Sequence, residues 1–203
     1  MTARQRQTAL LLGLLLLAGG LLAVLQHLAA PGIEAQRQLA AERRLLDLLP
    51  AGSYDNHPLR QPIALPSGGL LGNASADPAY PIRRGGQLQA LLLPVTTRGY
   101  EGPIRLLVAV SVEGRLLASK VLEQHETAGL GDLIERHRSP WLQHFDGKRL
   151  DDPEASWGLR AEGGQVDQIA GATVTSRAVR DALQRALRFF DSQREQLLQA
   201  AAP

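Results

Sequence analysis

The chain has 203 residues, of which 44% are hydrophobic, so it holds enough apolar material for one folded domain with a core. Its 22 Lys and Arg residues nearly balance 20 Asp and Glu, and no basic tract is interleaved with aromatic residues, so nucleic-acid binding is not expected. The chain contains no cysteine, which excludes disulfides, iron–sulfur ligation by thiolates and thioether haem attachment. Any redox cofactor is therefore held by other groups.

Residues 9–27 contain an uncharged, Leu-rich run that at about 1.5 Å per residue spans roughly 25 Å, close to the thickness of a bilayer core. We predict a transmembrane anchor there, preceded by a cytoplasmic segment at 1–8. Because Arg4 and Arg6 come before the run, the positive-inside rule places the following chain outside the cytoplasm, which in a bacterium is the periplasm. A cleaved signal peptide is the alternative, since Leu28-Ala29-Ala30 resembles a small-residue cleavage site.

Residues 28–60 are expected to form a helix and a linker outside the membrane. Apolar positions recur at helical spacing over 34–49, and Pro50-Ala51-Gly52 then stops the pattern. Pro, Gly, Asn and Asp are frequent over 53–86, which predicts loops and short strands. The remaining chain, 61–203, is predicted to form one domain with a C-terminal helix.

Three strands are predicted, at 87–97, 104–112 and 115–123, because β-branched and other apolar residues cluster there between turn signals. Glu113-Gly114 separates the last two strands and indicates a hairpin. The expected fold is therefore α+β, with one mixed or antiparallel sheet flanked by helices and preceded by the transmembrane helix.

The second half of the chain carries helix signals. Asp132 is expected to cap a short helix that runs through His137, and Ser139-Pro140 to start another that ends at Gly147. Trp157 is placed on a further strand. The last helix is predicted to run from Ser176 towards residue 200.

Residues 167–173 read Asp-Gln-Ile-Ala-Gly-Ala-Thr and stand just before that last helix. A helix start offers unsatisfied N–H groups and a partial positive charge, which suits a phosphate carried just upstream. Gly171 and Ala172 are small enough for backbone to approach a bulky ligand, and Arg177 and Arg180 are candidate phosphate partners. Thr175 and Ser176 are candidate helix caps, and an ordinary capped helix after a glycine turn is the simpler alternative.

The loop at 123–132 contains two patterns that resemble known sites. His125-Glu126 lacks the second His of a zincin, because position 129 is Gly, so no metal site is predicted. Gly129-Leu130-Gly131 lacks the third Gly of a dinucleotide fingerprint, because position 134 is Ile, so no nicotinamide site is predicted. The chain also has no Gly-x-Ser-x-Gly elbow and no clear nucleophile–base pair, so no catalytic residue is assigned.

Several of these segments together resemble one family. Residues 167–173 closely match Asp-x-x-Ser/Thr-Gly-Ala-Thr, the flavin-attachment sequence of membrane-anchored flavoproteins, and residues 99–187 resemble the G subunit of the Rnf (also called Rsx) electron-transport complex. The matching motifs are Gly99-Tyr100-Glu101-Gly102, the strand at 104–110 and the loop at 123–132. Ala128 replaces the family's usual Pro, and Ala170 its usual Ser or Thr.

The resemblance implies covalent FMN, joined through its phosphate to the hydroxyl of Thr173. It implies two groups of cofactor-binding residues, of which the first surrounds the acceptor and consists of Asp167, Gly171, Ala172, Thr173 and Thr175. The second group is the glycine loop, where Gly residues admit the flat ring and Glu126 and Thr127 bond its polar edge, and it consists of Glu126, Thr127, Leu130 and Gly131. An ordinary glycine turn that leads into a helix is the alternative for this loop.

The resemblance further implies an electron relay in the bacterial inner membrane. The expected partners are other membrane subunits of the complex, a flavin transferase that attaches FMN, and membrane lipid. One alternative is the C subunit of the sodium-pumping NADH:quinone reductase, which shares the attachment motif. Another is a membrane-anchored structural or binding module without flavin, for which Ala170 is the only sign.

Overall fold

A computed structural model gives the fold. It describes residues 13–22, 24–27, 36, 40, 42–50 and 52–202. The chain forms two compact units, Met1–Leu46 and Asp47–Pro203, and the second contains the folded domain.

The described residues of the first unit are helical, including 13–22, 24–27 and 42–46. The last of these segments falls within the helix predicted at 34–49. No helix among the described residues is both long enough and apolar enough to span a bilayer. The anchor predicted at 9–27 lies partly outside the described residues, and the segments 1–8 and 28–30 lie wholly outside them.

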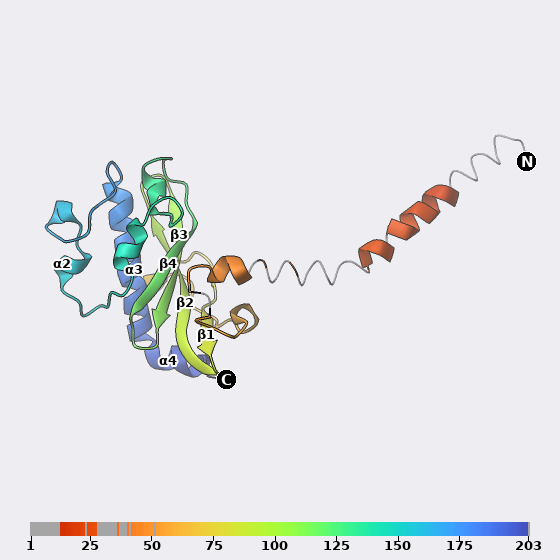
Figure 1. Cartoon of the computed structure of the whole chain (residues 1–203), viewed down its shortest axis with the longest axis horizontal. Helices are drawn as coiled ribbons and strands as arrows, with labels where there is room; N and C mark the ends of the chain where they lie inside the picture. The colour runs from red at the N-terminus through yellow and green to blue at the C-terminus, as the bar shows by residue number, and fades with distance from the viewer. Residues whose placement is uncertain are drawn as a thin grey trace, which may run out of the picture. The chain divides into compact units, whose positions relative to one another are not determined.

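The described part of the second unit contains one sheet of four antiparallel strands in the order β1-β2-β3-β4 (Figure 1). The strands are β1 (Tyr80–Arg84), β2 (Gln87–Arg98), β3 (Pro103–Ser111) and β4 (Leu116–Glu123). The last three confirm the predicted strands, and the all-antiparallel pairing settles the choice between a mixed and an antiparallel sheet. The prediction of an α+β fold is confirmed.

Two glycine turns set the register of this sheet. Arg84 pairs with Gln87 across the two-residue turn Gly85-Gly86, in which both residues have positive φ, 57° and 77°. Tight hairpins favour such turns because their twist matches that of the strands. Gly114, with φ of 82°, lies in the turn between β3 and β4, as the sequence predicted.

Helix α3 (Thr173–Ser192) packs against β2 and β3 and covers one face of the sheet (Figure 1). Its buried residues recur at helical spacing and include Val179, Leu183, Leu187 and Phe190. The helix begins before the predicted start at Ser176. It ends at Ser192, and α4 (Arg194–Ala200) follows after Gln193, where a single continuous helix was predicted.

The chain between β4 and α3 forms short helical turns around an aromatic cluster. The rings of Trp141 and Phe145 meet edge to face with centroids 5.3 Å apart, and Phe145 stacks on Trp157 at 5.7 Å. The indole N–H of Trp157 donates to the carbonyl of Arg149 at 2.9 Å. This cluster gives the segment an apolar core that no regular strand supplies.

Two predictions about the short elements are corrected. Trp157 ends α2 (Glu154–Trp157) and does not lie on a strand, because Pro153 precedes a helical turn. Asp132 lies inside η3 (Gly131–Ile134) and does not cap it; its carboxylate accepts the Gly129 N–H at 2.7 Å. The other short 3₁₀ turns are η1 (Pro58–Arg60), η2 (Gly69–Leu71), η4 (Trp141–Phe145) and η5 (Arg160–Glu162).

Candidate functional site

A cavity of about 440 Å³ opens at the start of α3 and is lined by three separate segments of the chain. Its volume is within the usual range for sites that hold small molecules or cofactors. The lining residues include every predicted cofactor-binding residue except Asp167, and they are Tyr100, Glu126, Thr127, Leu130, Gly131, Gly171, Ala172, Thr173, Val174 and Thr175. The fold thus brings together the two motifs that the sequence places far apart.

Thr173 is the first residue of α3 and is partly exposed at this cavity. The residue before it, Ala172, is the N-cap and supplies no side-chain hydrogen bond. The first N–H groups of a helix lack partners within the helix, so the positive end of α3 lies beside the Thr173 side chain. This arrangement favours an anionic group at the cavity.

Gly171 allows the turn into the helix. Its φ is +76°, a left-handed conformation that side chains rarely adopt, and a Cβ there would meet Leu130 Cδ2 at 3.1 Å. Glycine at this position therefore serves both the backbone turn and the close approach of Leu130.

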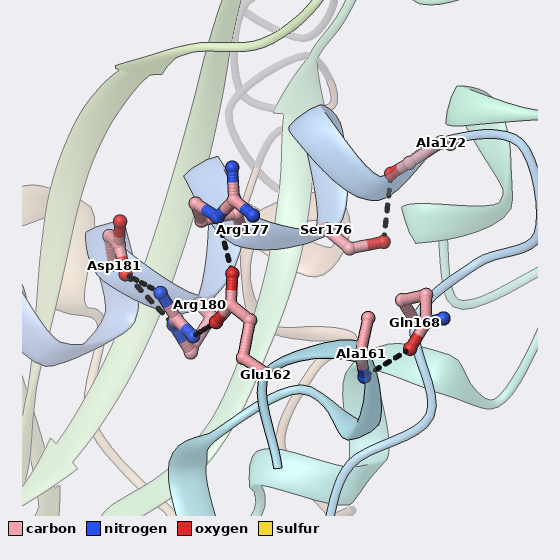
Figure 2. Close-up of polar contacts among 8 residues, drawn as sticks. All are labelled: Ala161, Glu162, Gln168, Ala172, Ser176, Arg177, Arg180 and Asp181. Carbon is pink, nitrogen blue, oxygen red and sulfur yellow. Dashed lines mark hydrogen bonds and ion pairs between the residues drawn. The ribbon is translucent and has the colours of Figure 1, made fainter. Parts of the chain in front are cut away.

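Thr175 and Ser176 do not cap α3, which corrects the sequence prediction. Both side chains are buried, and the Thr175 hydroxyl donates to the carboxylate of Glu126. The Ser176 hydroxyl donates to the Ala172 carbonyl at 2.9 Å (Figure 2). It also accepts the Ile169 N–H at 3.1 Å. Thr175 also lines the cavity but is only 1% exposed, whereas Thr173 is partly exposed there and no hydrogen bond within the described part of the chain turns its hydroxyl inward.

Glu126 is buried, with 8% of the residue exposed, and its two carboxylate oxygens are bound by the protein itself. One oxygen accepts the Glu101 N–H at 3.1 Å; the other accepts the Tyr100 N–H at 3.2 Å and the Thr175 hydroxyl. The sequence predicted that this carboxylate would bond the polar edge of a ligand ring. In the structure both oxygens accept hydrogen bonds from other parts of the chain.

Thr127 is exposed, and its hydroxyl donates to the Glu101 carboxylate at 2.6 Å. Gly131 is buried, and a Cβ there would lie 2.6 Å from the Cβ of Glu126. The sequence predicted that Gly131 would leave room for a flat ring. The space beside it is occupied by the Glu126 side chain.

Apolar side chains stand at the rim of the cavity. Tyr100 is 72% exposed, Val174 50% and Leu130 41%. Tyr100 belongs to one of the motifs that carry the family resemblance, whereas Val174 was not selected from the sequence. The position of Val174 directly after Thr173, at the outer side of a helix start, was the signal that could have identified it.

Asp167 lies outside the cavity lining. Its carboxylate pairs with Arg160 at 2.8 Å, and both side chains are about two-thirds exposed, at 68% and 66%. Its backbone carbonyl accepts the Trp141 indole N–H at 2.5 Å. The carboxylate therefore points to solvent, while the backbone is fixed to the aromatic cluster.

Arg177 and Arg180 both bind Glu162, each at 2.6 Å (Figure 2). Neither arginine lines the Thr173 cavity. Arg180 also pairs with Asp181 at 2.7 Å. Hydrogen bonds from Arg180 and Arg177 hold the pKa of Glu162 below its ordinary value. The expectation that these arginines are phosphate partners is not supported by their positions, because their guanidinium groups bind this carboxylate.

The residues at the cavity fit a phosphate-linked aromatic group. The helix start suits the phosphate and the exposed apolar rim suits a flat ring. Within the described ranges, no cluster of three or more His, Cys, Asp or Glu side chains could hold a metal ion.

Comparisons with known proteins identify the domain that contains this cavity. The FMN-binding domain family matches residues 99–188, which include both motifs of the cavity. The G subunit of the ion-translocating oxidoreductase complex of Pseudomonas aeruginosa is 50% identical over 196 residues, covering 95% of this chain and 91% of the relative. Its counterpart of the same name from Vibrio vulnificus is 37% identical over 181 residues, covering 88% and 85%.

A solved structure shares the fold. The crystal structure of Shewanella oneidensis NqrC superposes with a TM-score of 0.50 at 22% identity and covers 76% of each chain. At 22% identity this similarity shows a shared fold only. The relatives of much higher identity decide the family: the chain belongs to the family of G subunits of ion-translocating oxidoreductase complexes.

Proposed function

We propose that this protein carries FMN on the hydroxyl of Thr173 and relays electrons within a membrane-bound, ion-translocating oxidoreductase complex. The observation that carries the proposal is the position of Thr173, whose side chain lines the cavity while the neighbouring Thr175 and Ser176 hydroxyls are buried and bonded inward. The match to FMN-binding domains and the names of the relatives support the choice of cofactor and role.

The chain's own residues would hold the two ends of the cofactor differently. The start of α3 would face the phosphate ester at Thr173 with its free N–H groups. Tyr100, Leu130 and Val174 would contact the ring and exclude water from part of its surface. The flavin supplies the reversible uptake of electrons when it is bound.

Covalent attachment is tested by the intact mass of protein purified from a host that also expresses a flavin transferase. An ester between the Thr173 hydroxyl and the phosphate adds the mass of FMN less one water. We expect Thr173→Ala to remove this increment and the fluorescent band on a denaturing gel, and Thr175→Ala to keep both. The opposite pattern would assign the acceptor to Thr175 and refute the proposal.

The same measurement separates the proposal from its alternatives. A structural module without flavin would show no mass increment in the wild type. The C subunit of the sodium-pumping NADH:quinone reductase is disfavoured, because the relatives at 50% and 37% identity are G subunits.

We further propose that residues 9–27 anchor the protein in the inner membrane, with 28–60 as a connection and 61–203 in the periplasm. The uncharged run and the preceding Arg4 and Arg6 support this topology. Membrane lipid and the other subunits of the complex would then be the partners, with the flavin transferase acting on the same side. A phosphatase fused after Pro203 should be active. Activity of only a cytoplasmic reporter would refute the topology, and a mature N-terminus near Pro31 would refute the anchor.

A further inference from the structure

The carboxylate of Glu126 is the point at which the three segments that line the Thr173 cavity meet. Its donors come from the turn between β2 and β3, through the Tyr100 and Glu101 N–H groups, and from the first turn of α3, through the Thr175 hydroxyl. Glu126 itself belongs to the loop after β4 that supplies Leu130. We call these four residues, Tyr100, Glu101, Glu126 and Thr175, the Glu126 clamp.

Two glycines make room for this carboxylate. A Cβ at Gly99 would lie 2.3 Å from Glu126 Oε1, and a Cβ at Gly131 would lie 2.9 Å from Glu126 Oε2 and closer still to its Cβ. Neither glycine has a positive φ, so the backbone conformation does not account for glycine at these positions. The close approach of the Glu126 side chain explains why both positions are glycine.

The Glu126 clamp fixes the position of the cavity walls rather than that of Thr173. Tyr100 is 72% exposed, so its side chain has little packing of its own to hold it over the cavity. Its backbone N–H is fixed by the buried carboxylate, and hydrogen bonds to a charged group are stronger than those between neutral groups. Thr173 is held separately, by the helix of which it is the first residue.

We propose that Glu126 is a positioning residue for the flavin, because its clamp holds the Tyr100 turn and the Leu130 loop against the start of α3. The inference rests on the proposed function. A cofactor joined to Thr173 by one phosphate ester is free to rotate about several single bonds, so the walls of the cavity determine the orientation of its ring. Loss of the clamp leaves the flavin attached and its ring mobile.

Thr175 gives a matched pair of variants for the test. Thr175→Val keeps the shape of the side chain but removes the donor, whereas Thr175→Ser keeps the donor. Glu126→Gln replaces one accepting oxygen by an N–H₂ group, which cannot accept from the donors of the clamp. Glu123→Gln makes the same chemical change at an exposed carboxylate paired with Arg105 and serves as the control.

The first measurement is amide hydrogen exchange at Tyr100 and Glu101 in the full-length protein made without flavin transferase. We expect Glu126→Gln to exchange at least about tenfold faster than the wild type at one or both amides, because the substitution removes one of their accepting oxygens. Thr175→Val should also exchange faster, because it releases the carboxylate from the start of α3. Thr175→Ser and Glu123→Gln should stay close to the wild type. Unchanged exchange in Thr175→Val and Glu126→Gln would overturn the proposal.

The second measurement uses the same full-length variants made with the transferase. The mass of attached FMN should be unchanged in all of them, while flavin fluorescence anisotropy should fall in Thr175→Val and Glu126→Gln and be retained in Thr175→Ser. Faster exchange with unchanged anisotropy would overturn the positioning role. A wild-type protein that carries no flavin on Thr173 would overturn the proposed function, and the exchange data would still report on the clamp itself.

Discussion

Gly131 lies directly against the buried side chain of Glu126, so the addition of one methyl group there perturbs the Glu126 clamp from outside. The Cβ of Gly131→Ala would lie 2.6 Å from Glu126 Cβ, 2.9 Å from Oε2 and 3.2 Å from Cγ. The backbone at Gly131 needs no left-handed conformation. The cost of the substitution is therefore steric, and the Glu126 side chain has to move to relieve it.

The size of the effect follows from this overlap. Extra atoms forced into a packed site destabilise the folded state by about 1–3 kcal/mol. The Ala variant has a less flexible unfolded chain, which offsets about 0.4–1 kcal/mol of this loss. We expect Gly131→Ala to lower the free energy of unfolding by about 1–2 kcal/mol. With a slope of about 2 kcal/mol/M, the midpoint of urea unfolding should fall by about 0.5–1 M.

Gly129→Ala is the matched control in the same loop. Gly129 has a φ of +78°, and a Cβ there would meet nothing within 4 Å. Its replacement should cost about 1–2 kcal/mol through backbone strain alone, without moving Glu126. Only Gly131→Ala should accelerate amide exchange at Tyr100 and Glu101. Equal acceleration in both variants, or a Gly131→Ala protein as stable as the wild type, would refute the reasoning.

Two further predictions concern the segment between β4 and α3. The pKa of Glu162 is lowered by hydrogen bonds from Arg180 and Arg177, so its contribution to stability is present above the unfolded value of 4.5 and is lost as pH falls through the folded value. Urea unfolding compared between about pH 6 and about pH 3 should therefore show a smaller loss of stability in Glu162→Gln than in the wild type, and an equal loss would contradict this linkage. Trp157 is 2% exposed, so Trp157→Ala should lower the free energy of unfolding by about 3–5 kcal/mol. Leu117→Ala, at a 39% exposed position, should lower it by about 0.5 kcal/mol or less. Similar losses in both variants would contradict a core role for the aromatic cluster.

The strands were predictable because their signals are local. Apolar runs bounded by glycine turns gave β2, β3 and β4 close to their observed bounds. β1 fell within a region read only as loops and short strands, although the two-residue turn Gly85-Gly86 that pairs it with β2 is a recognised hairpin signal. The prediction of short strands there agrees with β1, but it gave no bounds, because the abundant Pro and Gly of 53–86 were weighed above the turn at its end.

The helix start was harder to place, because caps are recognised from side chains that bond the backbone locally. Thr175 and Ser176 are residue types that cap helices, yet α3 begins at Thr173 after Ala172, and both hydroxyls point inward. The partners of these hydroxyls are Glu126 for Thr175, and Ala172 and Ile169 for Ser176, and a capping pattern does not identify them. Trp157 was also misplaced: it ends the helical turn that follows Pro153, and its ring stacks on Phe145.

The sequence by itself determined the α+β class, most of the strands and the two motifs that line the cavity, since each depends on residue type and spacing within one segment. Tertiary structure decided what those residues bind. Glu126 and Thr175 are 49 positions apart, and their hydrogen bond exists only because the loop after β4 returns to the start of α3. Arg177 and Arg180 likewise bind Glu162, at separations of 15 and 18. A polar side chain takes the partner that the fold brings within about 3 Å, and that choice is made by the packing of distant segments.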